Sequence, residues 1–280
     1  MNPLYASINQ EIVRLENAQI SIQDLSIQRG FGIFDFLKIV GGTPIFLDQH
    51  IDRFYKSAQS MFLDVSLSKI NLKAHIYELL KKNNMPDAGL KFILTGGFSA
   101  DGYTFEKSTL ILNQSYFKLA REQRPTPLKL MSYNHQRQIP EVKTIDYIQA
   151  IRLQTQMKLN GADDILYRQE DYIRECPRAN IFIVKGNQIL TPKSEILLGI
   201  TRSKILEMHL PGYEILTKDF TLNDLYQAEE VFISSSTKNA TPVIDVDGIK
   251  IGNGEMGPIT TSINKKLWDL IDQDVYLHNP

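Results

Sequence analysis

The stretch "FGIFDFLKIVGGTPIFLDQHIDRF", residues 31–54, contains two kinds of structural signal joined by a turn. Apolar residues alternate and cluster over 31–40, which predicts a β-strand. "GGTP" predicts a turn, and Asp48 is placed to cap a helix over 48–62. One face of that helix is apolar at helical spacing, through Ile51, Phe54, Tyr55, Ala58, Met61 and Phe62. The stretch therefore predicts a strand followed by a helix with one buried face.

Strands and helices follow one another along the rest of the chain without regular alternation. A second helix is predicted over 67–84, and two further strands over 90–97 and 108–117. The elements predicted further on are a strand near 128–133, a helix over 146–159, hairpins turning near 170–171 and 186–187, a helix after "GITR" and a strand in "EEVFISSS". This order favours an α+β fold over a doubly wound parallel sheet.

Residues 118–129, "KLAREQRPTPLK", are charged, carry two prolines and lack periodicity. Such a segment is typical of a linker between domains. We therefore expect an N-terminal α/β domain over 1–117 and a C-terminal domain over 130–280.

Composition excludes several classes of function. The chain has 280 residues with a net charge of −1 and no long run of one sign, so no nucleic-acid or membrane footprint is expected. No secretory signal or apolar run of about 18 residues is visible. The one cysteine, Cys176, allows no internal disulfide and is compatible with the cytoplasm. The five histidines are far apart, so no metal site is predicted.

Lys143 is the residue on which a catalytic interpretation depends. In "PEVKTIDY", residues 140–147, it stands near apolar Val142 and Ile145 and just before a predicted helix. It is either a solvated surface lysine or an amine held in a pocket. Desolvation lowers the pKa of a lysine and favours the neutral amine that a nucleophile or base requires.

Other stretches have ordinary readings when taken singly. "RGFGIFD" has Asp35 where a third glycine would complete a dinucleotide fingerprint, so that interpretation is weak. His50, Arg53 and Ser57 share one edge of the predicted helix. Glu175 fits an exposed strand face, and "LLGITRSKIL" and "SSSTKNATP" fit ordinary loops.

Taken together and in order, these pieces resemble the class IV aminotransferases, the fold-type-IV enzymes that use pyridoxal 5′-phosphate. The resemblance runs from Gln28 to Lys265. Its pieces are "RGFGIFD", "DQHIDRFYKSAQSM", "VKTIDY", "GADDILY", "ECPRANIFIV", "TPKSEILLGITR", "AEEVFISSS", "TPVIDVDG" and "GPIT". It implies a small N-terminal α/β domain, a larger barrel-like α+β C-terminal domain and a homodimer.

The resemblance also implies which residues hold the cofactor. Lys143 occupies the position of the lysine that forms a Schiff base with the cofactor aldehyde and later carries the substrate Cα proton. Glu175 matches the carboxylate that faces the pyridine nitrogen and keeps the ring protonated. Tyr147 matches a residue that binds the ring oxygen. Arg53 matches the arginine that grips the phosphate, to which a planar guanidinium is suited.

The same resemblance implies the remaining contacts to phosphate and substrate. The backbone N–H groups of Ile200 and Thr201 open a helix and are expected to point at the phosphate, and Ser236 supplies a hydroxyl. The backbone at Thr237 is expected to bind a substrate carboxylate. Beyond the resemblance, we hypothesise that Lys238 supplies charge near that carboxylate; the alternative is a solvated loop lysine. Phe34 and Tyr103 are expected to complete the substrate pocket.

Two branches of the family compete for the function. In "LTGGFSADGY", residues 94–103, Gly96 and Asp101 stand where the lyase branch usually has arginines. Asp101 would repel an anionic substrate. A substrate with two carboxylates is therefore harder to hold, unless Lys238 or Arg178 substitutes for the missing arginines. "EC" at 175–176 leans toward the lyase.

We therefore predict an aminotransferase that acts on a small or apolar, branched-chain-like amino acid and a 2-oxo acid. The alternatives are a 4-amino-4-deoxychorismate lyase, which releases pyruvate in folate synthesis, and a non-catalytic binding protein on the same scaffold.

Overall fold

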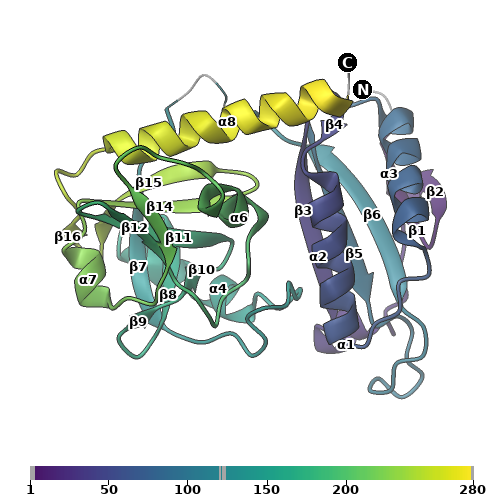
Figure 1. Cartoon of the computed structure of the whole chain (residues 1–280). Coiled ribbons are helices and arrows are strands. Elements are labelled where there is room, and N and C mark those ends of the chain that lie inside the picture. Colours follow the sequence, from purple (N-terminus) through teal and green to yellow (C-terminus); the bar gives the residue numbers. More distant parts are fainter. Residues whose placement is uncertain (1–3, 120, 122–123, 279–280) are drawn as a thin grey trace. The chain divides into compact units, whose positions relative to one another are not determined.

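The computed structural model describes residues 4–119, 121 and 124–278. The chain forms two compact units (Figure 1). Unit 1 comprises residues 1–119, 142–146 and 273–280, and unit 2 comprises 120–141 and 147–272. The expected linker over 118–129 includes residues 120, 122 and 123, which lie outside the described residues, and its last two residues begin a strand.

Unit 1 is built on an antiparallel sheet in the order β2-β1-β6-β5-β3-β4. The strands are β1 (Tyr5–Ile8), β2 (Glu11–Arg14), β3 (Gly32–Val40), β4 (Thr43–Pro44), β5 (Ala88–Thr95) and β6 (Thr109–Tyr116). The helical elements are η1 (Leu15–Asn17), α1 (Leu25–Arg29), α2 (Leu47–Ser60) and α3 (Lys69–Asn83). The strands and helices predicted between residues 31 and 117 are thereby confirmed, apart from their end residues.

One apolar core lies between the sheet and helices α2 and α3 of unit 1. Ile33 and Leu37 of β3, Phe54 of α2 and Ile76 of α3 belong to it, and each is fully buried. Because side chains alternate along a strand, the odd-numbered residues of β3 face the helices. Asp35 shares this register and is also fully buried, so a carboxylate lies in an otherwise apolar layer.

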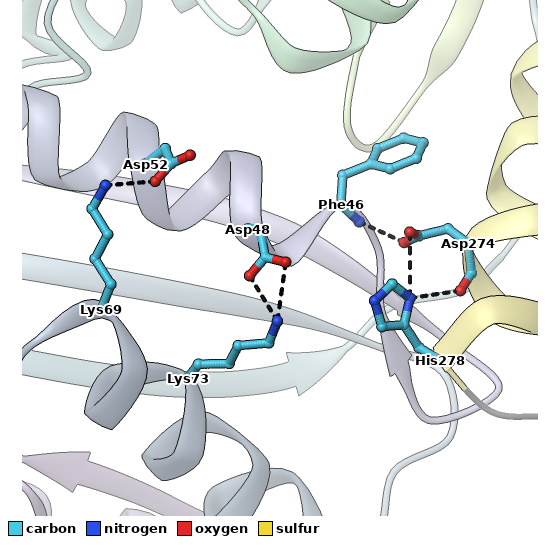
Figure 2. A network of polar contacts seen from close by, with 7 residues as sticks. All are labelled: Phe46, Asp48, Asp52, Lys69, Lys73, Asp274 and His278. Carbon is cyan, nitrogen blue, oxygen red and sulfur yellow. Dashed lines mark hydrogen bonds and ion pairs between the residues drawn. The ribbon is translucent and has the colours of Figure 1, made fainter.

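Two ion pairs align helices α2 and α3 side by side (Figure 2). Lys69 Nζ lies 2.6 Å from Asp52 Oδ1, and Lys73 Nζ lies 2.7 Å from Asp48 Oδ1. From the first pair to the second, the lysine moves four residues forward along α3 and the aspartate moves four residues back along α2. The two helices are therefore antiparallel. Surface pairs of this kind contribute at most about 1 kcal/mol each, and the core supplies most of the packing energy.

Helix α2 lies within two residues of its expected bounds, but two expected details of its ends were wrong. Asp48 does not cap it, because Phe46 holds the cap position with φ 54° and no side-chain cap bond. The N–H of Phe46 instead donates to Asp274 Oδ2 at 2.8 Å (Figure 2), and a carboxylate suits the positive end of a helix. Phe62, predicted on the buried face, is 84% exposed because the helix ends at Ser60.

Unit 2 contains a mixed sheet in the order β13-β12-β11-β14-β15-β7-β8-β9, with β10 paired to β11 and β16 to β15. Its strands are β7 (Leu128–Asn134), β8 (Asp164–Gln169), β9 (Tyr172–Ile173), β10 (Glu175–Cys176), β11 (Ala179–Lys185), β12 (Gln188–Thr191), β13 (Glu214–Thr217), β14 (Glu230–Ser235), β15 (Asn239–Val246) and β16 (Ile249–Lys250). The β8–β9 and β11–β12 hairpins turn at 170–171 and 186–187, as predicted.

Short helices and one long helix complete unit 2. They are α4 (Ile148–Arg152), α5 (Gln154–Leu159), α6 (Ile200–Leu206), α7 (Leu222–Tyr226) and α8 (Pro258–His278), whose last residues belong to unit 1. The single helix predicted over 146–159 was wrong in one respect, since it is divided at Leu153 into α4 and α5. The long helix α8 was not predicted.

The sheet of unit 2 buries apolar side chains on both faces. Ile181 and Ile183 of β11 belong to one core cluster, and the intervening Phe182 belongs to another. Phe182 stacks on Phe232 of β14 with ring centroids 4.9 Å apart. Together the two units form the two-domain α+β fold that the sequence predicts.

In the part of the chain that the structure describes, no helix combines the length and apolarity needed to cross a membrane. Within the same residues, no group of three or more His, Cys, Asp or Glu side chains is arranged to hold a metal ion.

Candidate active site

Lys143 lies in a short segment that pairs with the edge of β3 in unit 1. The N–H of Phe34 donates to the Lys143 carbonyl at 2.9 Å, and the N–H of Ile145 donates to the Gly32 carbonyl at 3.1 Å. Strand β4 covers only the far end of this edge. A Cβ on Gly32 would lie 2.8 Å from the Leu94 carbonyl oxygen. The close backbone packing here therefore requires glycine.

The side chain of Lys143 lies against an aromatic ring. Its Nζ is 4.5 Å from the Phe34 ring centroid, within the range of a cation–π contact. The neighbouring Val142 is 4% exposed, and Lys143 itself is half-buried. Lys143 is thus not a fully solvated surface lysine, and the predicted substrate residue Phe34 is in contact with it.

Asp35, His50 and Arg53 form a buried polar cluster next to this segment. Arg53 donates through Nε to Asp35 Oδ2 and through Nη2 to Oδ1, both at 2.8 Å. His50 Nδ1 lies 2.7 Å from Asp35 Oδ1. The side chains are 0%, 2% and 14% exposed for Asp35, His50 and Arg53 respectively. A two-bond arginine–carboxylate pair of this kind fixes the plane of the guanidinium.

The charges of this cluster follow from its burial and its partners. Burial raises the pKa of Asp35, but Arg53 and His50 outweigh it and hold that pKa well below its usual value. Burial is the largest effect and lowers the pKa of His50. The Asp35 carboxylate raises it and Arg53 and Lys143 lower it, so the pKa lies below its usual value. The imidazole is therefore neutral near pH 7. Since Asp35 is ionised, Nδ1 of His50 carries the hydrogen and donates it.

Helix α2 connects the cluster to Lys143. His50, Arg53 and Ser57 lie on one edge of the helix, as their spacing predicted. The buried Ser57 Oγ is 3.5 Å from the Lys143 backbone nitrogen. Lys143, Phe34 and Arg53 are thus brought together in unit 1, whereas Tyr103 is 83% exposed on a separate loop.

That loop explains why an aspartate stands in "LTGGFSADGY". Asp101 accepts hydrogen bonds from the backbone N–H groups of Tyr103 and Thr104 at 2.9 and 2.7 Å. The Thr104 and Ser99 hydroxyls donate to it as well, at 2.8 and 3.0 Å. The amide of Thr104 and these other donors hold the pKa of Asp101 well below its usual value. Asp101 is therefore an ionised, loop-building residue.

In unit 2, Glu175 is a buried carboxylate with partners on both oxygens. Arg137 donates to Glu175 Oε1 through Nε at 2.9 Å and Nη2 at 2.7 Å. The N–H of Leu197 donates to Oε2 at 3.0 Å. The side chain is 6% exposed, so Glu175 does not lie on an exposed strand face. Arg137 has no local signal in the sequence, because it lies 38 residues from its partner.

The start of α6 places Ile200 and Thr201 in a buried first turn. Its cap residue, Gly199, makes no side-chain cap bond, so first-turn N–H groups are left without that partner. A Cβ on Gly199 would lie 2.1 Å from Asn180 Oδ1. The buried Arg202 donates to the Pro192 carbonyl at 2.8 Å and to Thr191 Oγ1 at 3.3 Å. Both acceptors are neutral, and burial lowers the pKa of Arg202 while the nearby Glu175 carboxylate raises it.

The β14–β15 turn holds Ser236, Thr237 and Lys238. The Lys238 N–H donates to Ser235 Oγ at 3.2 Å, and Thr237 is exposed at the tip. Lys238 Nζ lies 3.8 Å from Oδ2 of the buried Asp164.

A second cation reaches the same carboxylate oxygen. Arg178 Nη2 lies 3.7 Å from Asp164 Oδ2. Lys238 and Arg178, which the sequence offered as replacements for the missing arginines, therefore both lie next to the buried Asp164 carboxylate. Tyr147, the remaining predicted cofactor residue, takes the N-cap position of α4.

Asp35 and Asp164 were not predicted as site residues. The signal for Asp35 was present in the sequence, since it is a lone carboxylate in the buried register of an apolar strand. Asp164 carried no such signal, because "GADDILY" has two adjacent acids and no pattern that distinguishes them.

A family model described as amino-transferase class IV matches residues 32–246. A putative branched-chain-amino-acid aminotransferase of Methanocaldococcus jannaschii is 29% identical over 280 residues, which cover 94% of this chain and 95% of the relative. A D-alanine aminotransferase of Listeria monocytogenes serotype 4b is 28% identical, over 92% of this chain and 93% of the relative.

Solved structures show the same fold. The branched-chain amino acid aminotransferase of Escherichia coli superposes with a TM-score of 0.87 at 24% identity, covering 96% of this chain and 95% of that chain. The branched-chain aminotransferase of the thermophilic archaeon Thermoproteus uzoniensis, solved with norvaline, gives a TM-score of 0.86 at 22% identity, covering 97% and 96%. A further branched-chain amino acid aminotransferase, solved with pyridoxamine 5′-phosphate, gives a TM-score of 0.87 at 22% identity, covering 97% and 95%.

We predict that Asp35→Asn lowers the free energy of unfolding at about pH 7 by roughly 3 kcal/mol, because it leaves the Arg53 charge buried without its counter-charge. The folded-state pKa of Asp35 is below its unfolded value. The contribution of ionised Asp35 to the free energy of unfolding is therefore complete above about pH 3.9, the pKa of an aspartate in the unfolded chain. It is lost as the pH falls below that value toward the folded-state pKa. Urea unfolding at a series of pH values measures the difference between the two proteins. A difference that stays constant from about pH 5 to pH 3 would contradict this assignment.

Proposed function

The chain belongs to the class IV aminotransferase family, and we propose that it moves an amino group between a small or apolar, branched-chain-like amino acid and a 2-oxo acid. It is an enzyme that depends on pyridoxal phosphate. The observation that carries the proposal is the family match over 32–246 together with a lysine, Lys143, held on the β3 edge within it. The M. jannaschii and L. monocytogenes relatives, described as branched-chain and D-alanine aminotransferases, support the substrate class.

The residues present fit the cofactor chemically. When bound, pyridoxal phosphate supplies an aldehyde that takes up amino groups and a protonated ring that withdraws electrons. The donor set includes an amine at Lys143, a buried carboxylate at Glu175 and a guanidinium at Arg53. These are the three groups that an aldehyde, a ring nitrogen and a phosphate require.

We propose that Lys143 binds the cofactor and then moves the proton at the substrate Cα. Its contact with Phe34 limits the positions of the side chain, which favours one direction of approach. Glu175 would hold a proton on the ring nitrogen. Its ion pair with Arg137 keeps that carboxylate in place, so Arg137 acts through Glu175.

Arg53, Ile200, Thr201 and Ser236 are the residues that we propose for the phosphate. Arg53 offers the guanidinium edge that Asp35 does not use. The start of α6 offers backbone N–H groups, and the nearby Arg202 is a buried cation with neutral partners. Tyr147 is proposed to bind the ring oxygen.

The ionised Asp101 favours an aminotransferase over the lyase. A lyase substrate with two carboxylates would meet this fixed negative charge where arginines are usual. Incubation with 2-oxoglutarate and a panel of amino acids, and separately with aminodeoxychorismate, distinguishes the two activities. Pyruvate release without amino-group exchange would overturn the proposal.

We predict that borohydride reduction of the holoenzyme attaches the cofactor to Lys143, and that peptide mapping finds it there. Lys143→Ala should lower turnover by at least about 100-fold, because it removes the proton carrier. Circular dichroism should show an unchanged fold. Label on another side chain, or no label, would disprove the assignment, and a colourless protein that takes up no cofactor would favour a non-catalytic scaffold.

We predict that Lys238→Ala raises the KM for accepted substrates by about tenfold with little change in kcat, because it removes a charge that binds the substrate carboxylate. Asp164 holds the lysine in place for this role. Lys250→Ala, at an exposed lysine on β16, is the matched control. An unchanged KM for every accepted substrate in Lys238→Ala would remove Lys238 from the site.

We propose further that the enzyme works as a homodimer in the cytoplasm. The family resemblance supports the homodimer, and the buried free thiol of Cys176 is compatible with a reducing compartment. Light scattering of the purified protein should give twice the mass of one chain. The mass of a single chain would contradict the homodimer.

A further inference from the structure

We propose that Asp35 is a positioning residue that orients Arg53 for the cofactor phosphate before the cofactor arrives. The inference rests on the proposed function, because it assumes that Arg53 binds that phosphate. Asp35 itself touches neither cofactor nor substrate in this scheme. It acts through the guanidinium that it holds.

The position of Asp35 in β3 has no packing explanation. Its neighbours in the same register, Ile33 and Leu37, are fully buried apolar residues of the core. An ionised carboxylate in that layer is costly unless it is compensated. An apolar side chain would serve the strand better, so the carboxylate has a function other than packing.

The hydrogen bonds of Asp35 fully determine the plane of Arg53. Oδ2 accepts from Arg53 Nε, and Oδ1 accepts from Arg53 Nη2 and from His50 at Nδ1. Oδ1 also accepts the backbone N–H of Phe36 at 2.7 Å, which fixes the carboxylate itself. The guanidinium has five donors in a rigid fork, and Asp35 takes two of them. The other edge, which includes Nη1, faces away from Asp35.

His50 makes the arrangement more rigid. It is the residue one helical turn before Arg53 on α2, and its ring is 2% exposed. With Nδ1 bound to the same oxygen as Arg53 Nη2, the imidazole prevents the carboxylate from rotating away. Arg53 is therefore already ordered before the cofactor binds, so binding does not have to offset the conformational entropy of ordering this side chain.

Two effects of Asp35 on phosphate binding have opposite signs, and this makes the proposal testable. A negative charge beside Arg53 repels an anion, so electrostatics alone predicts that Asp35→Asn tightens phosphate binding. Positioning predicts the reverse, because an unheld guanidinium must be ordered when the anion binds. The geometry points to positioning as the larger effect, since two bonds at 2.8 Å fix a nearly buried side chain.

The test measures cofactor affinity in the apoenzyme by absorbance titration with pyridoxal 5′-phosphate and with pyridoxal, which lacks the phosphate. Asp35→Asn should raise the Kd for pyridoxal 5′-phosphate by at least about tenfold, as expected for lost charge-assisted hydrogen bonding. The Kd for pyridoxal should change by less than about twofold. Asp52→Asn, at an exposed aspartate on the same helix paired with Lys69, is the control and should bind both ligands as wild type does.

A double-mutant cycle separates positioning from general damage. If Asp35 acts through Arg53, the variant Asp35→Asn/Arg53→Ala should bind pyridoxal 5′-phosphate no more weakly than Arg53→Ala alone. Unchanged or tighter binding by Asp35→Asn, an equal loss of pyridoxal affinity, or additive losses in the double variant would each overturn the proposal.

A second variant covers the case in which Asp35→Asn does not fold. Asp35→Glu keeps the charge but moves it by one methylene, so it should fold and still bind pyridoxal 5′-phosphate less tightly than wild type, with pyridoxal affinity unchanged. Wild-type affinity in Asp35→Glu would overturn the proposal. Failure of the proposed function looks different, because it appears in the substrates that the wild-type protein accepts and leaves the cofactor affinities of the variants unchanged.

Discussion

A buried ion pair between a strand and a helix is the constraint on which the chemistry of unit 1 depends. Asp35 lies in the apolar layer between sheet and helices, and its carboxylate oxygens accept hydrogen bonds from Arg53 and His50 of α2. Removing any one partner would leave an uncompensated polar group in that layer. The pair therefore fixes the position of α2 on β3, and with it the edge of the helix that reaches Lys143 through Ser57.

Unit 2 uses the same physical device for a different group. Glu175 is buried and is held by Arg137 on one oxygen and by the Leu197 N–H on the other. Each unit thus keeps a carboxylate in a low-dielectric place by giving it an arginine and a further donor. One carboxylate, at Asp35, orients a cation, whereas the other, at Glu175, is itself the group proposed to face the cofactor.

The sequence predicted the type of most elements better than their ends. Alternation in β3 and helical spacing in α2 were strong signals, and the hairpin turns followed from glycine and polar residues. The end of α2 at Ser60 and the division at Leu153 were missed, because caps and breaks depend on contacts made elsewhere in the fold. The cap of α2 is an example, since its acceptor is Asp274 at the other end of the chain.

What the sequence by itself determined is the α+β architecture, the family and the identities of the candidate residues, including Lys143, because these depend on local pattern and on motif order. What only the tertiary structure decided is how those residues are held. Asp35 was read in the sequence as a missing glycine, and Asp101 as a missing arginine. Their roles as an anchor for Arg53 and as a loop builder appeared only in three dimensions. The reason is physical, since the partner that gives a charged side chain its orientation is chosen by proximity in space. Periodicity can place each residue on a face of its own element, but it does not show which residues of two elements meet.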